Sequence, residues 1–155
     1  LPMTTDKALQ LITGLCSKKE YCTADILEKL RKWEISDKDM QKIMTFLYQH
    51  KFIDDSRFAR IYTEDKFRFN HWGKQKISLM LRQKNIPPEI IAEALNAVDS
   101  QSYREQCRNL LEQKMKTLNE KDPYKLKAKL IRFGLGRGFD FDTIQTCLPH
   151  LLPTD

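Results

Sequence analysis

The sequence predicts an all-α protein, built from three copies of a three-helix unit arranged as a curved, elongated array. Its 155 residues include a single valine, and no stretch alternates apolar and polar residues as a half-buried strand does. Apolar residues recur instead at helical spacing. This pattern repeats at intervals of 51 and 53 residues, as is typical of tandem structural repeats.

The repeat is clearest in the second and third helices of each unit. Five of six aligned positions are apolar in every copy, and the sixth changes from leucine to Gly134. The aligned sets are Ile26, Leu30, Ile35, Met40, Ile43 and Leu47; Ile77, Leu81, Ile86, Ile91, Ala94 and Val98; and Leu130, Gly134, Phe139, Ile144, Cys147 and Leu151. We therefore predict repeat units at residues 1–53, 54–99 and 100–155.

Helix signals in the first unit are an apolar stripe followed by two caps. The stripe from Ala8 to Leu15 predicts the first helix. Thr23 is the expected N-cap of the second helix, and Ser36 that of the third. We expect Trp33 to anchor the core of this unit.

The middle unit begins at the polar turn 54–56, and its first helix should face the core through Phe58, Ile61, Tyr62 and Phe69. Gly73 marks the junction with a second helix that runs to Lys84. Asn85 tolerates the left-handed conformation that ends a helix. The stretch Pro87–Glu89 then opens the third helix, because proline suits a first helical turn.

The last unit opens with a long amphipathic helix from Tyr103 to Leu118. Asp122 and Pro123 provide an N-cap and a first-turn proline for the next helix. Three glycines follow at alternate positions, but no strand precedes them and no Lys-Ser/Thr follows, which disfavours a phosphate loop. Gly138 is the expected left-handed residue at the helix end. Either Asp140 or Asp142 should cap the final helix, which Pro149 ends or kinks.

No catalytic, metal or cofactor site is predicted. The four cysteines form no C-x-x-C motif and lie near no histidine at metal-ligand spacing, so we expect buried reduced thiols. The three histidines fall one in each unit, without a nucleophile or carboxylate at a telling spacing. The sequence shows no apolar stretch long enough to span a membrane and no secretory-signal pattern, so we expect a cytoplasmic protein.

Positive charge is concentrated locally within a net charge of +6. The stretch 66–84 holds six basic residues and no acidic one, and 121–137 holds six basic residues and one acidic residue. Such clusters fit a polyanion or an acidic protein surface, although a solvated helix face explains them as well. The candidate partner-binding residues are Arg57, Arg60, Arg68, Lys74, Lys76, Arg82, Lys125, Lys127, Lys129, Arg132 and Arg137.

Two longer motifs run through the second and third units. The middle unit has D-x-R-F-A at 55–59, then G-x-x-x-I-x-x-x-L at 73–81 and a turn before Ile86, and the third has R-G-F at 137–139. Further matching positions are Tyr62, Ile91, Ala94, Leu95, Asp142 and Ile144. With these motifs the chain resembles the RecX family of bacterial recombinase regulators, most strongly over residues 54–98. It departs from the family pattern at Asn85, where glycine is usual, and at Gly134, which replaces a core leucine.

The resemblance implies a tandem helical array that binds RecA nucleoprotein filaments. Such proteins lie in the helical groove of the filament, contact neighbouring protomers and restrain ATP hydrolysis, strand exchange and co-protease activity. For this chain it implies the RecA filament as the protein partner, DNA as a further contact, and a monomer. Among the basic candidates Arg57 belongs to the family motif, and a structural salt bridge to Asp54 or Asp55 is the competing explanation for it.

Two other functions fit the residues: a helix-turn-helix protein that binds nucleic acid without a recombinase, and a helical scaffold for another protein. A sequence-specific DNA reader needs Arg, Asn or Gln side chains aimed at base edges from one helix. The candidate helices here carry scattered lysines, which favours contacts with a phosphate backbone or a protein.

Overall fold

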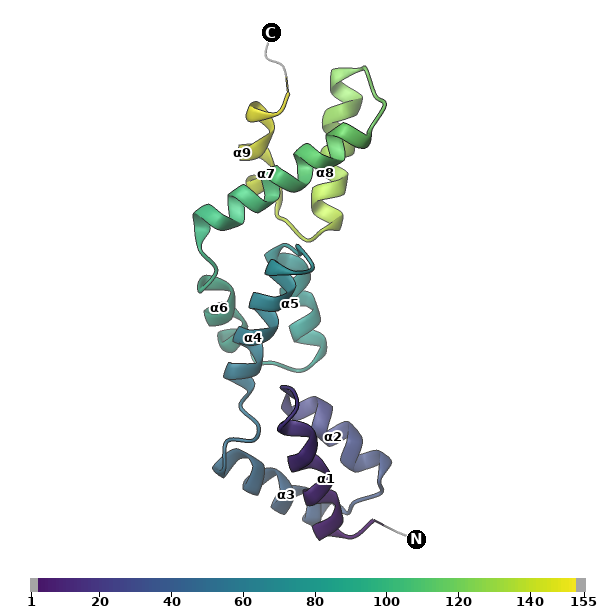
Figure 1. The fold of residues 1–155 in the computed structure, drawn as a ribbon, viewed down its shortest axis with the longest axis vertical. Coiled ribbons are helices and arrows are strands. Elements are labelled where there is room, and N and C mark those ends of the chain that lie inside the picture. Colours follow the sequence, from purple (N-terminus) through teal and green to yellow (C-terminus); the bar gives the residue numbers. More distant parts are fainter. Residues whose placement is uncertain (1–2, 153–155) are drawn as a thin grey trace.

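The computed structural model describes residues 3–152 as nine α-helices and a short 3-10 helix, with no strand in that range. Figure 1 shows the helices following one another along an elongated molecule, with α1 and α9 toward opposite ends. No helix among the described residues is long and apolar enough to span a bilayer. The predicted all-α repeat fold is confirmed.

The helices follow the expected order along the chain. The first unit contains α1 (Thr5–Cys16), α2 (Thr23–Lys32) and α3 (Asp37–Gln49). The second contains α4 (Asp55–Arg68), α5 (Lys74–Gln83) and α6 (Pro88–Asn96). The third contains α7 (Ser100–Thr117), α8 (Pro123–Gly136), α9 (Phe141–Cys147) and the 3-10 helix η1 (Leu148–His150).

Each unit has a hydrophobic core of its own. Ile12, Ile26 and Leu47 lie in the first core, Ile77 and Leu81 in the second, and Leu111, Leu130 and Ile144 in the third. Cys22 lies at the start of α2 but packs into the second core. Val98, at the end of the predicted second unit, likewise packs into the third core. The division of the chain at residues 53 and 99 therefore stays a prediction.

The same turn ends the second helix of every unit. One residue takes a positive φ, and the buried residue after it donates its N–H to a carbonyl five residues earlier, which is the Schellman motif. The left-handed residues are Glu34 (φ 57°), Asn85 (φ 60°) and Gly138 (φ 96°). The hydrogen bonds are Ile35 to Leu30 (3.1 Å), Ile86 to Leu81 (3.1 Å) and Phe139 to Gly134 (3.0 Å). The sequence repeat is therefore a repeat of backbone geometry.

Most of the predicted caps are present, and one is wrong. The Ser36, Asp54 and Asp122 side chains each accept an N–H at the start of their helices, and Asp140 caps α9. Thr23 is not the N-cap of α2. Cys22 takes that place, and its N–H donates to the Asp25 carboxylate, while the Thr23 hydroxyl lies 2.6 Å from that of Tyr48.

Two residues expected in the second core are exposed. Ile61 is 41% exposed and Phe69 is 70% exposed. The buried stripe of α4 runs through Phe58, Ala59 and Thr63, and Ile61 lies on the opposite side because each residue advances about 100° around the helix. Phe69 follows the last helical residue, where the stripe no longer applies.

Two residues singled out in the sequence, the expected core anchor Trp33 and the substituted Gly134, lie at their cores in different ways. Trp33 is half-buried at the edge of the first core. Gly134 lies in the third core, where a Cβ would come within 2.7 Å of Ile144 Cδ1. The Ile144 side chain therefore occupies the space that a leucine would fill at the matching position.

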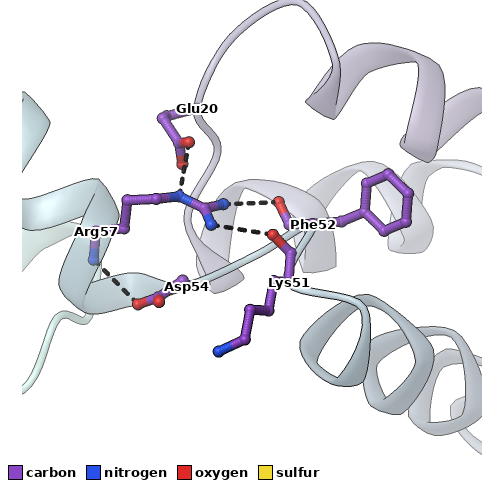
Figure 2. A network of polar contacts seen from close by, with 5 residues as sticks. All are labelled: Glu20, Lys51, Phe52, Asp54 and Arg57. Carbon is purple, nitrogen blue, oxygen red and sulfur yellow. Dashed lines mark hydrogen bonds and ion pairs between the residues drawn. The ribbon is translucent and has the colours of Figure 1, made fainter.

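Arg57 joins the first and second units (Figure 2). Its Nε donates to Glu20 Oε1 at 2.8 Å, and its two terminal nitrogens donate to the carbonyls of Lys51 (3.0 Å) and Phe52 (3.3 Å). Asp54 accepts only the backbone N–H of Arg57. The structural salt bridge of Arg57 is thus with Glu20, and neither Asp54 nor Asp55 provides it.

A second ion pair crosses the same junction. The Lys84 ammonium donates to Asp25 Oδ1 at 2.9 Å. Burial alone raises the pKa of Asp25, but hydrogen bonds from Lys84 and from the Cys22 N–H hold it below the ordinary 3.8. Burial lowers the pKa of Lys84, while the hydrogen bond and charge of Asp25 raise it above 10.5.

Main-chain groups of the second unit make several of its contacts with the third. Gly73 precedes α5 without a capping side chain, and its N–H donates to the Arg137 carbonyl at 2.8 Å. The next two N–H groups donate to the Tyr103 hydroxyl (2.8 Å) and the Gly138 carbonyl (2.9 Å). The third unit thus satisfies the N–H groups that a helix start leaves unpaired.

Glycine is required on both sides of this contact. A Cβ on Gly73 would lie 2.3 Å from the Gly138 carbonyl carbon, and a Cβ on Gly138 would lie 2.4 Å from Lys76 Cβ. We predict that Gly73→Ala lowers the free energy of unfolding by about 1–3 kcal/mol, because the two backbones must move apart. Urea denaturation of the whole chain measures this change.

Gly136→Ala is the matched control, because nothing lies within 4 Å of a Cβ at Gly136. Replacing this glycine should leave stability unchanged or raise it slightly, since alanine restricts the unfolded chain. Equal effects of the two substitutions would contradict the required close approach.

We predict that Arg57→Met destabilises the protein by about 1–2 kcal/mol, because Glu20 loses its hydrogen-bond partner in a half-buried site. Arg60→Met serves as the control, since Arg60 is exposed on the same helix and forms no ion pair with a described residue. A Glu20→Gln double-mutant cycle measures the coupling by denaturation. A coupling energy near zero would argue against the junction.

The Asp25–Lys84 pair should stabilise the fold between pH 3.8 and 10.5. Its contribution is lost as the pH falls through the depressed pKa of Asp25, or rises through the raised pKa of Lys84. The difference in unfolding free energy between the protein and its Lys84→Met variant should therefore be constant near neutrality and shrink at both extremes. A difference that is independent of pH would refute this linkage.

Candidate functional site

A groove of about 610 Å³ lies where α5 faces α8, across the junction of the second and third units. We call it the α5–α8 groove. Its lining residues are Lys74, Gln75, Lys76, Ser78, Leu79, Arg82, Leu95, Leu135, Gly136 and Gly138. The set contains three cations and three leucines, without a carboxylate or an aromatic ring.

The three groove cations form no ion pair among the described residues, although Asp140 is close enough for the charge of Lys74 to help lower the pKa of its carboxyl. The Lys74 ammonium lies 4.9 Å from the centre of the Tyr103 ring, and that of Lys76 lies 4.6 Å from the centre of Trp72. Aromatic faces attract cations without neutralising them, so these contacts orient the lysines and leave their charge available.

The walls also carry apolar side chains that face solvent. Leu79 of α5 and Leu135 of α8 are each 47% exposed, and the half-buried Leu95 lies beside them. Leucine on opposite walls of one groove is an apolar surface that a partner can cover. The groove therefore combines anion-binding and apolar contacts.

The inter-unit contacts fix the shape of this groove. Gly73 and Gly138 hold the start of α5 against the end of α8. Tyr103 lies between Phe67 and Phe139, with ring centres 5.9 Å and 5.1 Å away. Burial raises the pKa of Tyr103, so its hydroxyl stays neutral while it accepts the Lys74 N–H.

The structure brings three of the eleven candidate residues together in the groove: Lys74, Lys76 and Arg82. Of these, Lys74 and Lys76 are half-buried and Arg82 is exposed. Four other candidates are exposed on α4 and α8 outside the groove and have no ion-pair partner among residues 3–152. These are Arg60, Lys125, Lys127 and Arg132.

The other four candidates already make contacts within the protein. Arg57 lies at the first junction, and Arg137 donates to the Asn70 carbonyl at the second. Arg68 pairs with Glu64, and Lys129 pairs with Glu120. These ion pairs reduce the charge that the surface offers, and a role in partner binding stays a prediction for all eleven residues.

The groove contains residues that the sequence patterns did not single out, chiefly Leu79, Leu135 and the main chain around Gly136. A signal was present in α5. Leu79 falls between Ile77 and Leu81, off the buried side of α5. An unexplained leucine on the polar side of a helix indicates a surface that another molecule can cover.

The cysteines and metal-binding side chains do not form a second site. All four cysteines are free thiols, and the described residues contain no cluster of three or more histidine, cysteine or acidic side chains that could hold a metal ion. Cys107 and Cys147 are neighbours in the third core. The neighbouring Cys147 and burial raise the pKa of Cys107, and the Cys147 thiol donates to the Arg104 carbonyl, with its Sγ 3.7 Å from that oxygen.

Comparisons with known proteins place the two walls of the groove in two family domains. Residues 54–95 match the model of the second three-helix domain of RecX, and residues 101–148 match that of the third. The Regulatory protein RecX of Chlorobaculum tepidum is 35% identical over 147 residues, which cover 95% of this chain and 87% of that protein. The chain belongs to the RecX family. The α5 wall lies in the second RecX domain and the α8 wall in the third.

Other relatives and solved structures agree. The Regulatory protein RecX of Prosthecochloris aestuarii is 34% identical, with 96% of this chain and 95% of that protein covered. That of Clostridium tetani is 34% identical over 89% of this chain, which spans only 64% of the relative's length. The crystal structure of RecX from Lactobacillus salivarius has a TM-score of 0.88 at 22% identity, covering 95% of this chain and 96% of that one, which shows the shared fold.

Proposed function

We propose that this protein is a regulator, mainly negative, of the RecA recombinase, and that it binds in the groove of the RecA nucleoprotein filament. Membership of the RecX family supports the regulatory role, since relatives matched over nearly their whole length bear the name Regulatory protein RecX. The three cations of the α5–α8 groove, which form no ion pair among the described residues, are the observation that carries the contact, because they suit an acidic protein surface or a phosphate backbone.

The elongated array suits a filament because it can contact more than one RecA protomer. Once one weak contact has formed, the next contact on the same molecule forms at a high effective concentration. A chain that bridges protomers restrains their relative movement, and we infer that it thereby restrains ATP hydrolysis, strand exchange and co-protease activity. The proposal needs no catalytic residue and no cofactor, and it places the protein in the cytoplasm as a monomer.

A nucleic-acid-binding function without a recombinase is the second candidate. Tyr124 at the start of α8 is 87% exposed, and Lys125, Lys127 and Arg132 are exposed on the same helix. Exposed aromatic rings beside cations are a common way to bind single-stranded nucleic acid. This alternative predicts affinity for DNA alone, with a steep dependence on salt.

Titrating this protein into single-stranded-DNA-dependent ATP hydrolysis by the cognate RecA tests the first proposal. We predict inhibition at well below one molecule per RecA protomer. The Lys74→Glu/Arg82→Glu variant should need a concentration about tenfold higher for the same inhibition. Two groove cations become carboxylates, which repel an acidic partner surface.

The matched control is Lys125→Glu/Arg132→Glu, which changes net charge by the same amount on exposed residues of α8 outside the groove. Near-normal inhibition by this control would assign the effect to the groove. Equal losses in both variants would point to net charge instead. Inhibition absent at every ratio would rule out the RecA proposal and favour the nucleic-acid alternative.

A further inference from the structure

The α5–α8 groove has a lining that narrows its ligand class. Its cations select an anion, and its exposed leucines select an apolar group on the same ligand. Arg82 has a guanidinium that can grip a carboxylate through two parallel hydrogen bonds, and Lys76 is a point charge on the same wall. Gln75 and Ser78 add neutral hydrogen-bonding groups along α5.

The apolar part of the lining argues against a nucleic acid. Bases are held on proteins mainly by stacking on aromatic rings, and no aromatic residue lines this groove. A phosphate backbone would pair with the cations but would leave Leu79 and Leu135 without an apolar partner. An aliphatic side chain of a protein is the partner that suits both, because the two exposed leucines line the same groove from α5 and α8.

The size of the groove limits the ligand to a short segment. A volume of about 610 Å³ lies in the range of clefts that hold a few side chains. The space beside Gly136 is open, since nothing lies within 4 Å of a Cβ built there. A segment of a partner protein can therefore enter along the α8 wall.

We propose that the α5–α8 groove binds a short acidic segment of a partner protein, with carboxylates on the groove cations and one leucine-sized side chain between Leu79 and Leu135. The inference deepens the proposed function and rests on it, because it names the part of the protein partner that this surface takes. Charge complementarity and the exposed leucines select this occupant.

Fluorescence anisotropy of the full chain with three labelled probes tests the inference. The probes are the peptide Glu-Asp-Leu-Glu-Asp, the same peptide with serine in place of leucine, and an oligothymidylate of about ten nucleotides. The leucine peptide should bind best, and the serine peptide should bind at least about fivefold more weakly because the apolar contact is lost.

Two variants act on the groove without changing its charge. Leu79→Ser removes one apolar wall at a surface position, so folding should be unaffected. Gly136→Leu places a side chain in the open part of the groove, and Gly136→Ala is its control for the fold. Each groove variant should weaken the leucine peptide by about fivefold or more and leave the serine peptide unchanged.

Binding of the leucine peptide that is indifferent to both variants would overturn the inference. The inference would also be overturned if the oligothymidylate bound more tightly than the leucine peptide and if Gly136→Leu abolished that binding. If peptide binding fails while ATP hydrolysis by RecA is still inhibited, the ligand class is wrong and the proposed function stands. If the peptide binds as expected but RecA is unaffected, the ligand class stands and the recombinase assignment fails.

Discussion

The direct contact of Gly73 with Gly138 is the constraint on which the rest of this structure depends. Two backbones approach so closely that a Cβ on either glycine would overlap the other segment. In return, the first N–H groups of α5 find acceptors in the third unit, so the start of this helix is capped by a neighbouring domain and not by its own N-cap residue. One contact thereby sets the start of α5, the orientation of the third unit and the position of one groove wall against the other.

An arginine makes hydrogen bonds across each of the two junctions between units. This changes how the basic charge of the chain should be interpreted. Arg57 closes the gap between the first two units, while Arg137 offers its carbonyl to Gly73 and its guanidinium to Asn70. Both cations therefore hold the array together. Because Arg68 and Lys129 also pair with acids, the surface charge is more local than the net charge of the chain indicates. The α5–α8 groove stands out because three cations without an ion-pair partner among the described residues line one cavity.

Local physics explains which features could be predicted from the sequence. The Asn85 and Gly138 turns, the Asp54 and Asp122 caps and the helix spans all depend on residues within one or two turns of each other. The failures involve distant parts of the chain. Thr23 lost the cap position because Cys22 packs into the second core, and Arg57 found a partner 37 positions away in Glu20. Only the basic residues of the groove were predicted from the sequence. Its leucines come from two units, so they form one surface only when those units pack together.

The balance between cores and junctions determines how the units of the array are held together. Extensive helix–helix packing falls within units, whereas polar groups and a few close main-chain contacts carry much of the contact between them. Polar contacts are directional, so they define one spacing and one orientation of the units. They bury less apolar surface than a domain core does. Each unit therefore keeps a core of its own, while the junctions hold it in a defined position relative to its neighbour. An array of this kind can present the same groove, at a defined spacing from the other units, to a partner whose surface follows a helical path.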